Sequence, residues 1–336
     1  MKIAILTPTF SHFSGIDRVV ELQAQDYVKK NNEVAVFALG ASLKPKNFKL
    51  EVLGMPKNIF LQRVYRLLFF LDLKKIKTAA EKLKNYEIVI SHFYPMNLIA
   101  DYAKKKYNVR YIYYNHGICY SDLFDSFFER CYMKLFYLLN KISLRNADST
   151  ISISKFLQRE LKSETNLDSK VVYNKIDKER FRKGIDGSRM RKALHIKNGN
   201  NLLLFVGRLS PHKNVHSLLK ILDLVNEKMP DAKLLIIGKP TFKAYYRNLR
   251  NMASKNVIFK EFVSDKDLPY CYAACDLYAT ASLWEGFNLP AAEAQACGKK
   301  VVAYDVCSHP EIVKNGILVK KDDMQGFANA IIKLLK

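Results

Sequence analysis

Short apolar runs of strand length alternate along the chain with longer segments in which apolar residues recur at helical spacing. The runs lie at residues 2–8, 34–38, 87–91, 109–114, 201–206, 233–238, 256–259, 275–279 and 301–303. Continuous apolar runs of this length, bounded by turn residues, predict strands that are buried on both faces. Because helical segments such as 17–30 separate them, we expect parallel β–α–β units and an α/β, doubly wound architecture.

The length of 336 residues is enough for two such domains, and the 49% apolar content is enough to give each a core. The sequence contains no run of about 18 apolar residues without charges, so it predicts no transmembrane helix. The apolar run at the N-terminus is too short for a signal peptide and predicts a first strand. The six cysteines form no C-x-x-C pair, so we expect free thiols, as in a reducing cytoplasm.

The net charge of +23 is spread unevenly over the chain. Residues 1–200 carry 36 Lys and Arg against 19 Asp and Glu, whereas residues 201–336 carry 19 against 13. This surplus indicates attraction to an anionic surface or polymer, and it says nothing about the fold.

Residues 59–84 combine a wide apolar stripe with many cations, and residues 127–145 repeat the pattern more weakly. A helix of this composition can rest in the headgroup region of an anionic bilayer. It can equally be a core helix with a solvated basic end. The sequence leaves both interpretations open.

The stretch Trp284–Asp305 carries the strongest candidate chemistry, because Glu285 and Glu293 stand near a predicted helix start. Asn288 is a suitable helix cap, and a Pro in the first turn is tolerated. We therefore expect Glu285 in the loop before the helix and Glu293 in its first turns. Both carboxylates can then face one cleft at a helix N-terminus, which favours phosphate.

A pair of cations follows the predicted strand 201–206, in Gly207-Arg208-Leu209-Ser210-Pro211-His212-Lys213-Asn214. Arg208 leaves the carboxyl end of the strand, and Lys213 precedes a helix. A planar guanidinium and a point-charge ammonium across one turn can hold the two phosphates of a nucleoside diphosphate.

These two stretches resemble the motifs G-R-L-x-x-x-K-[GN] and E-x7-E of retaining nucleotide-sugar glycosyltransferases with the GT-B fold, most closely family 4. Weaker similarities support the resemblance over almost the whole chain. Ser14–Val19 resembles the family's G-G-x-[ED]-R stretch, and Asn115-His116-Gly117 resembles its H-[DG] pair. Ala147–Ser154 resembles the last strand of the family's first domain, and Asn174–Asp177 resembles the crossing between its domains.

The resemblance implies two Rossmann-like domains facing across a cleft, an acceptor-side domain of residues 1–172 and a donor-binding domain of residues 173–336. In such enzymes Arg208 and Lys213 would bind the diphosphate, Glu293 the ribose hydroxyls and Glu285 the sugar hydroxyls. His116 would contact the donor sugar or its phosphate, although a His that only caps its loop fits the sequence too.

The remaining expected contacts are made through the backbone. Gly15 would approach the donor phosphate or the acceptor, and the loop after Gly238 would lie near the base. The N–H groups of Phe287, Asn288 and Leu289 would meet the phosphate or sugar, with Asn288 in place of the family's usual Gly.

The resemblance also implies a metal-independent hexosyltransferase with no cofactor other than its nucleotide-sugar donor. Asp265-Lys266-Asp267 spells the D-x-D of another glycosyltransferase fold, but we interpret it as helix capping. The basic, aromatic first half favours a lipid-linked or glycan acceptor at the inner membrane face. Two alternatives remain, a nucleotide-sugar epimerase of the same fold and a basic nucleic-acid-binding protein; we expect no nucleic-acid partner, because no groove-reading motif is present.

Overall fold

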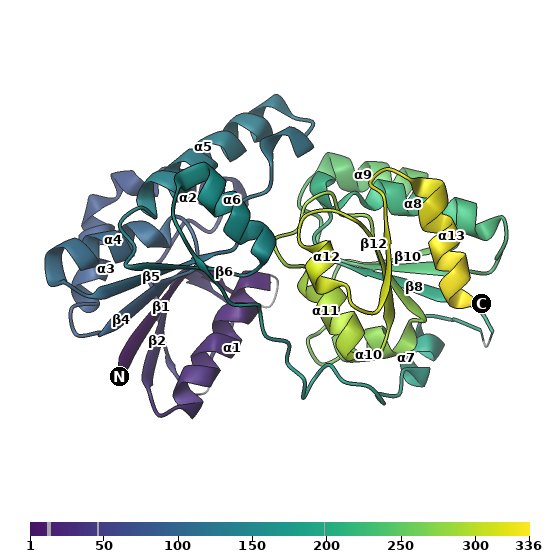
Figure 1. Cartoon of the computed structure of the whole chain (residues 1–336), viewed down its shortest axis with the longest axis horizontal. Helices are drawn as coiled ribbons and strands as arrows, with labels where there is room; N and C mark the ends of the chain where they lie inside the picture. Colours follow the sequence, from purple (N-terminus) through teal and green to yellow (C-terminus); the bar gives the residue numbers. More distant parts are fainter. Residues whose placement is uncertain (12–14, 46, 198) are drawn as a thin grey trace. The chain divides into compact units, whose positions relative to one another are not determined.

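The computed structural model in Figure 1 describes residues 1–11, 15–45, 47–197 and 199–336. The chain divides into two compact units. The first contains residues 1–121 and 126–175, and the second contains residues 122–125 and 176–336. The expected division between residues 172 and 173 falls just before the last of these boundaries.

The first unit is built on a seven-stranded parallel sheet of order β3-β2-β1-β4-β5-β6-β7. Its strands are β1 (Lys2–Phe10), β2 (Glu33–Ala41), β3 (Lys49–Val52), β4 (Ile88–Ser91), β5 (Arg110–Asn115), β6 (Ser149–Ser152) and β7 (Lys170–Val171). The central strand β1 is almost wholly buried, which explains its continuous apolar run. The strand order reverses between β1 and β4, as in a doubly wound sheet.

Helices follow most of these strands. They are α1 (Gly15–Lys29), α2 (Ile59–Leu67), η1 (Phe69–Leu71), α3 (Leu73–Lys82), α4 (Met96–Tyr107), η2 (Ser121–Leu123), α5 (Phe127–Ser143) and α6 (Lys155–Thr165). One prediction about this unit is wrong: the strand within residues 147–154 is not its last. The two-residue strand β7 pairs beyond it, with Ile151 opposite Lys170.

The apolar and basic segment 59–84 is not one helix but three helical pieces. The chain breaks at Asp72, whose carboxylate accepts hydrogen bonds from the Lys75 N–H at 3.1 Å and the Tyr65 hydroxyl at 2.7 Å. Helix α3 buries Ile76 and neighbouring alanines, whereas α2 has no buried residue. The core interpretation therefore holds for α3, and α2 remains at the surface.

The second unit has a six-stranded parallel sheet of order β10-β9-β8-β11-β12-β13, which reverses between β8 and β11. Its elements are β8 (Leu202–Val206), β9 (Lys233–Ile237), β10 (Val257–Lys260), β11 (Leu277–Thr280), β12 (Lys300–Tyr304), β13 (Gly316–Val319), α7 (Ser188–Ala193), η3 (Pro211–Lys213), α8 (Val215–Asn226), α9 (Lys243–Met252), α10 (Leu268–Ala274), α11 (Leu289–Ala296), α12 (His309–Ile312) and α13 (Met324–Leu335). The two doubly wound sheets predicted from the sequence are thus confirmed.

Apolar cores cover both faces of this second sheet. One core joins the sheet to α8 and α13 and includes Leu222, Ile236 and Phe327; the other joins it to α10 and α11 and includes Tyr272 and Ala294. All six cysteines are free thiols, as predicted. Among the helices in the described part of the chain, none has the length and apolar character needed to cross a membrane.

Candidate active site

The two strongest sequence motifs of the second unit lie at the point where its strand order reverses. Arg208 and Lys213 follow β8, and Glu285 follows β11, which pairs with β8 in parallel register. In an open parallel sheet, the crevice at the carboxyl ends of two such strands is where ligands bind. The topology therefore brings the cation pair and the acidic stretch to one edge.

A backbone hydrogen bond joins the two loops, in which the Leu283 N–H donates to the His212 carbonyl oxygen at 2.8 Å. Next to this bond, the Lys213 ammonium nitrogen lies 2.7 Å from Oε1 of Glu285. The two side chains are only 15% and 11% exposed. A largely buried ion pair thus stands beyond the carboxyl ends of β8 and β11.

Arg208 is exposed just beyond the end of β8. Burial lowers the pKa of His212 well below its usual value, and the charges of Lys213 and Arg208 lower it further. Both cations therefore act on the same ring. The two cations thus lie within electrostatic reach of one buried ring, and their joint role stays a prediction.

Gly238 lies at the end of β9, where the backbone comes very close to that of Gly207. A Cβ atom added to Gly238 would stand 1.8 Å from the Gly207 carbonyl oxygen. The Gly207 N–H donates in turn to the Ile237 carbonyl at 3.0 Å, which extends the pairing of the two strands into their loops. This close approach explains the glycine without a ligand, so its expected place near a base stays a prediction.

Glu293 lies in α11, and one of its carboxylate oxygens accepts a hydrogen bond from the buried Tyr272 hydroxyl at 2.8 Å. The ring of Tyr272 lies 6.3 Å from that of Tyr278, whose hydroxyl donates to the Val206 carbonyl at 3.2 Å. Burial raises the pKa of Tyr278 well above its usual value, and the charges of Glu285 and Glu293 add to the shift. Both carboxylates of the E-x7-E stretch are therefore close to the end of β8.

Asn288 caps α11 as predicted, accepting a hydrogen bond from the Ala291 N–H at 3.1 Å. Its backbone is left-handed, with φ of 65°, a conformation that asparagine tolerates and glycine adopts freely. Its side-chain amide donates to Nε2 of His309 at 2.9 Å, and His309 Nδ1 donates to the Tyr304 carbonyl at 2.7 Å. Burial lowers the pKa of His309, in keeping with this neutral tautomer.

The backbone N–H groups expected to meet a ligand belong to Phe287, Asn288 and Leu289, which form the entry to α11. Phe287 and Asn288 are buried, and Leu289 is half-buried. On the other side of this entry, the Ser308 hydroxyl donates to the Glu285 carbonyl at 2.9 Å and holds the loop in place.

In the first unit, His116 lies just past the end of β5 and is buried against His92. The two ring nitrogens, Nε2 of His116 and Nδ1 of His92, are 2.9 Å apart, and Nε2 of His92 lies 2.7 Å from the Gln23 amide oxygen. Burial lowers the pKa of His116 to about 3 and that of His92 well below its usual value, so both rings are neutral.

These contacts fix both tautomers. Because the Gln23 oxygen can only accept, His92 carries its proton on Nε2 and its Nδ1 accepts. The proton of His116 is then on Nε2, and its Nδ1 is left as an acceptor. His116 is thus a neutral, oriented ring at the carboxyl edge of its sheet.

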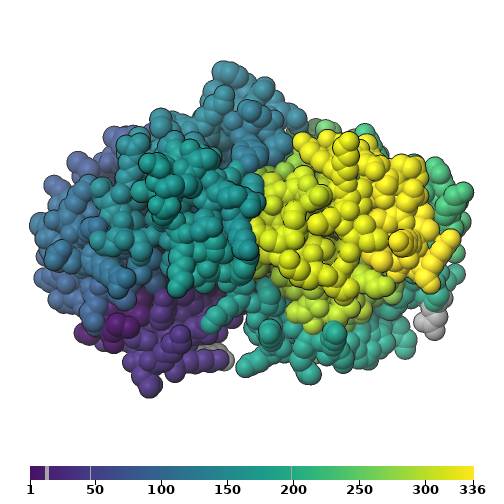
Figure 2. Space-filling model, in the orientation of Figure 1, coloured from purple at the N-terminus to yellow at the C-terminus, as the bar shows by residue number. Residues whose placement is uncertain are grey.

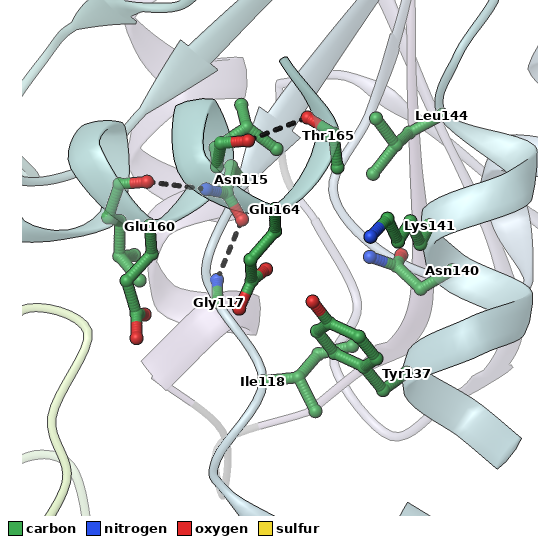
Figure 3. A pocket seen from close by; sticks show the side chains of 12 residues that line it. Asn115, Gly117, Ile118, Tyr137, Asn140, Lys141, Leu144, Glu160, Glu164 and Thr165 are labelled. Carbon is green, nitrogen blue, oxygen red and sulfur yellow. Dashed lines mark hydrogen bonds between the residues drawn. The ribbon is translucent and has the colours of Figure 1, made fainter. Parts of the chain in front are cut away.

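A small cavity lies beside this edge, as Figure 3 shows. Its volume is ≈ 30 Å³, room for about one water molecule, so it is not a sugar site. Asn115 closes one side, accepting from the Gly117 N–H at 3.0 Å and donating to the Leu157 carbonyl at 3.3 Å. Burial raises the pKa of Glu160, which also lines the cavity, to about 7.

Gly15 is the first residue of α1, and the Ser14 that precedes it is outside the described residues. Within the described part of this motif, Asp17 is fully buried. Its carboxylate accepts from the Ser11 N–H at 2.8 Å and the Thr9 hydroxyl at 3.1 Å. Burial raises the pKa of Asp17 to about 6, and the carboxyl group ties the end of β1 to the helix.

The D-x-D sequence does not cap a helix with its side chains. Asp265 pairs with Arg180 at 3.8 Å, and Asp267 accepts from the Ser264 hydroxyl at 2.6 Å. Asp267 is nevertheless the N-cap residue of α10, as predicted, and its N–H donates to the Ser264 hydroxyl at 3.1 Å. Over the described ranges, no three His, Cys, Asp or Glu side chains gather in a way that could hold a metal ion.

Sequence reasoning missed three contributors to these sites: His92, Tyr272 and His309. His92 had a readable signal, since it follows a strand at its carboxyl end just as His116 does. Tyr272 and His309 had none, because each lies in a short helix, where a buried Tyr or His gives no pattern that marks a site.

Comparison with known proteins supports the same division. A family model described as Glycosyltransferase Family 4 matches residues 13–180, half of the chain. A second, described as Glycosyl transferases group 1, matches residues 186–336. The two alternatives, an epimerase and a nucleic-acid-binding protein, are not favoured by these matches.

Curated relatives and solved structures agree. The chain is 36% identical over 175 residues to D-inositol 3-phosphate glycosyltransferase of Mycobacterium sp. (strain KMS), covering 49% of this chain but only 39% of that relative. It is 27% identical to the O-antigen chain mannosyltransferase RfbU of Salmonella typhimurium, over 74% of this chain and 65% of that one. The structure of Anabaena HepE in complex with UDP and glucose has the same fold, with a TM-score of 0.80, 23% identity and coverage of 100% and 90%.

Proposed function

The chain belongs to Glycosyltransferase Family 4, and on that premise we propose that it transfers a hexose from a UDP- or GDP-sugar to a lipid-linked or glycan acceptor, with retention of anomeric configuration and without a metal ion. The observation that carries the proposal is the ion pair of Lys213 and Glu285 at the point where the strand order reverses. A nucleotide-sugar donor has a diphosphate, which a cation can bind, and a ring with many hydroxyls, which a carboxylate can bind. This pair would supply both groups side by side.

The donor would separate this pair. Its diphosphate would take the ammonium of Lys213, together with the fork of Arg208, and its sugar hydroxyls would take the carboxylate of Glu285. Glu293, oriented by Tyr272, would accept from the ribose hydroxyls. The N–H groups at the entry of α11, from Phe287 to Leu289, would add partial positive charge near the phosphate or sugar.

The chemistry follows from where charge develops. Cleavage of the anomeric C–O bond leaves an oxocarbenium-like sugar and a diphosphate with added negative charge. Arg208 and Lys213 would stabilise that leaving group, and each contact would lower the barrier by about 2–4 kcal/mol. The departing phosphate would accept the proton of the acceptor hydroxyl, which attacks from the same face, so retention would need no protein nucleophile.

The first unit would supply the acceptor side. His116 would present its unprotonated Nδ1 to a hydroxyl of the donor sugar, and Gly15 at the start of α1 would let backbone approach the phosphate or acceptor. The basic surplus of residues 1–200 suits an acceptor that carries phosphate at the inner face of a membrane. The relative named as an O-antigen chain mannosyltransferase supports a glycan acceptor.

The test begins with a thermal-shift screen of UDP-, GDP- and ADP-sugars, because a bound donor raises the melting temperature. The donor found is then used to assay transfer, with EDTA present and with NMR of the anomeric proton of the product. We expect turnover with EDTA and a retained anomer. Glu285→Ala should lower kcat far more than it weakens binding of the free nucleotide, and unchanged turnover would refute the role of Glu285.

A further inference from the structure

Two helices of the first unit carry large apolar side chains on the outside of the molecule. On α2, Phe60 is 71% exposed, and on α5, Phe128 is 82% exposed. In Figure 2 the blue atoms around the start of α5 project from the rest of their unit, at the top of the view. Aromatic side chains this exposed are unusual on a surface that stays in water.

Exposed apolar positions recur at spacings of three and four along the whole of α5: Phe128, Cys131, Leu135, Leu138 and Ile142. Along α2 and its C-cap residue they recur at spacings of four, at Phe60, Val64 and Leu68, and Ile59 and Leu61 are exposed beside them. A stripe with this period is normally buried against the core. Here the core-facing side is a different one, since α5 buries Phe136, Asn140 and Ser143.

The two helices are fastened together into one surface. The guanidinium of Arg63 on α2 makes two hydrogen bonds to the carboxylate of Glu129 on α5, at 2.9 and 2.5 Å. The same guanidinium lies 4.7 Å from the centre of the Tyr132 ring. This bidentate bond holds the two apolar stripes together, and the guanidinium balances the negative charge of Glu129.

The charges around the stripes are almost all positive. Residues 57–84 contain eight Lys and Arg against two acids, and residues 127–145 contain four against one. Glu129 is paired with Arg63, and Asp72 is paired with Lys75 at 3.8 Å. The exposed Arg130 and Lys134 stand beside the stripe of α5.

We infer that the face formed by α2 and α5, the α2–α5 face, docks on the surface of a bilayer rich in anionic lipid. Apolar side chains enter the boundary between headgroups and acyl chains, while the surrounding cations meet lipid phosphate. A second copy of the chain would bring the same positive charges against each other, so charge complementarity favours the bilayer. The inference deepens the proposed function, whose acceptor it places at a membrane, but docking itself needs neither donor nor transfer.

The first experiment is flotation of the full chain with vesicles of phosphatidylglycerol and phosphatidylcholine, or of phosphatidylcholine alone, without donor. We expect binding to the anionic vesicles that falls at least tenfold at 0.5 M salt, and little binding to the neutral ones. Phe128→Ser combined with Leu135→Ser should weaken binding about tenfold or more. Arg130→Gln combined with Lys134→Gln should weaken it about fivefold for each charge removed.

Matched controls lie on the second unit. Tyr270→Ser removes an aromatic that is exposed on α10, and Lys228→Gln combined with Lys314→Gln removes two exposed cations. These variants should bind as the parent does, and melting temperatures of all variants should agree within a few degrees. Equal binding to both kinds of vesicle, or equal loss in the control variants, would overturn the inference.

Cys131 provides a second readout that does not depend on any loss of apolar surface. It is exposed within the α5 stripe, whereas Cys271, Cys275 and Cys297 are buried. An environment-sensitive fluorophore on Cys131, in a background with Cys119→Ser and Cys307→Ser, should shift to shorter wavelength on anionic vesicles only. No shift despite flotation would assign membrane binding to another surface, and a doubled mass in solution that Phe128→Ser abolishes would assign the face to a second copy of the chain.

Discussion

Lys213 and Glu285 form an ion pair of 2.7 Å although they belong to different loops of the second unit, one after β8 and one after β11. The backbone bond between Leu283 and His212 sets the two loops at this distance. The pairing of these two side chains is therefore fixed by the backbone of their own loops.

A double-mutant cycle measures this pair. Lys213→Met or Glu285→Gln alone leaves one largely buried group without its partner, so each should lower the free energy of unfolding by about 1–3 kcal/mol. The double variant should cost less than the sum of the two. Urea unfolding gives the coupling, and strictly additive losses would show that the pair adds nothing to stability.

Tyr272→Phe tests whether the orientation of Glu293 matters for the donor. The variant removes one hydroxyl that donates to the carboxylate at 2.8 Å and leaves the ring in place. We expect a stability loss of about 1–2 kcal/mol and a several-fold higher KM for the donor with kcat little changed.

The matched control for this prediction is Tyr278→Phe, which removes a buried hydroxyl that donates to the Val206 carbonyl and not to Glu293. It should cost similar stability without raising the donor KM. A rise in KM of the same size in both variants would mean that any loosening of this core disturbs the site.

Much of the second unit could be predicted because its strands are buried on both faces and so read as unbroken apolar runs. The entry to α11 could be predicted too, since Asn288 and Pro290 are residues with known places at a helix start. Both signals are local, which is why a single sequence carries them.

The remaining features depend on contacts between distant segments. The pairing of Lys213 with Glu285 requires the register of β8 against β11, which no local pattern encodes. The break of residues 59–84 at Asp72 depends on a hydrogen bond from Tyr65, and the two-residue strand β7 is too short to show a period. His92 was readable by position alone, as His116 was.

A further prediction concerns Asn288. This residue combines a left-handed backbone with the cap of α11 and a hydrogen bond to His309. Asn288→Ala loses the cap and places a Cβ residue in the left-handed region, so it should lower the free energy of unfolding by about 2 kcal/mol. Asn288→Gly loses the cap but relieves the backbone, and it should cost about 1 kcal/mol or less. Chemical denaturation distinguishes the two, and equal losses would contradict the role of the left-handed backbone.

The buried histidines predict how the stability of the first unit depends on pH. The pKa of His116 falls from about 6.5 in the unfolded chain to about 3 in the folded one. Below pH 6.5 the unfolded chain binds a proton at His116 that the folded chain does not bind, so the free energy of unfolding decreases as the pH falls. Between pH 8 and pH 5 the loss should be about 2 kcal/mol for His116, and the lowered pKa of His92 adds a loss in the same direction.

Asp17 acts in the opposite sense, because its pKa is raised to about 6. Between pH 6 and 3.8, the ordinary pKa of an aspartate, the folded chain binds a proton at Asp17 that the unfolded chain does not. This group therefore stabilises the folded chain as the pH falls. Glu160, whose pKa is raised to about 7, gains stability in the same way, so each group is measured as a difference from the parent. Urea unfolding should show that the change in stability between pH 8 and pH 5 is less unfavourable in His116→Gln than in the parent, and more unfavourable in Asp17→Asn. A pH dependence left unchanged by His116→Gln would mean that the two histidines are hydrated rather than buried together, and the tautomer assigned to His116 would no longer hold.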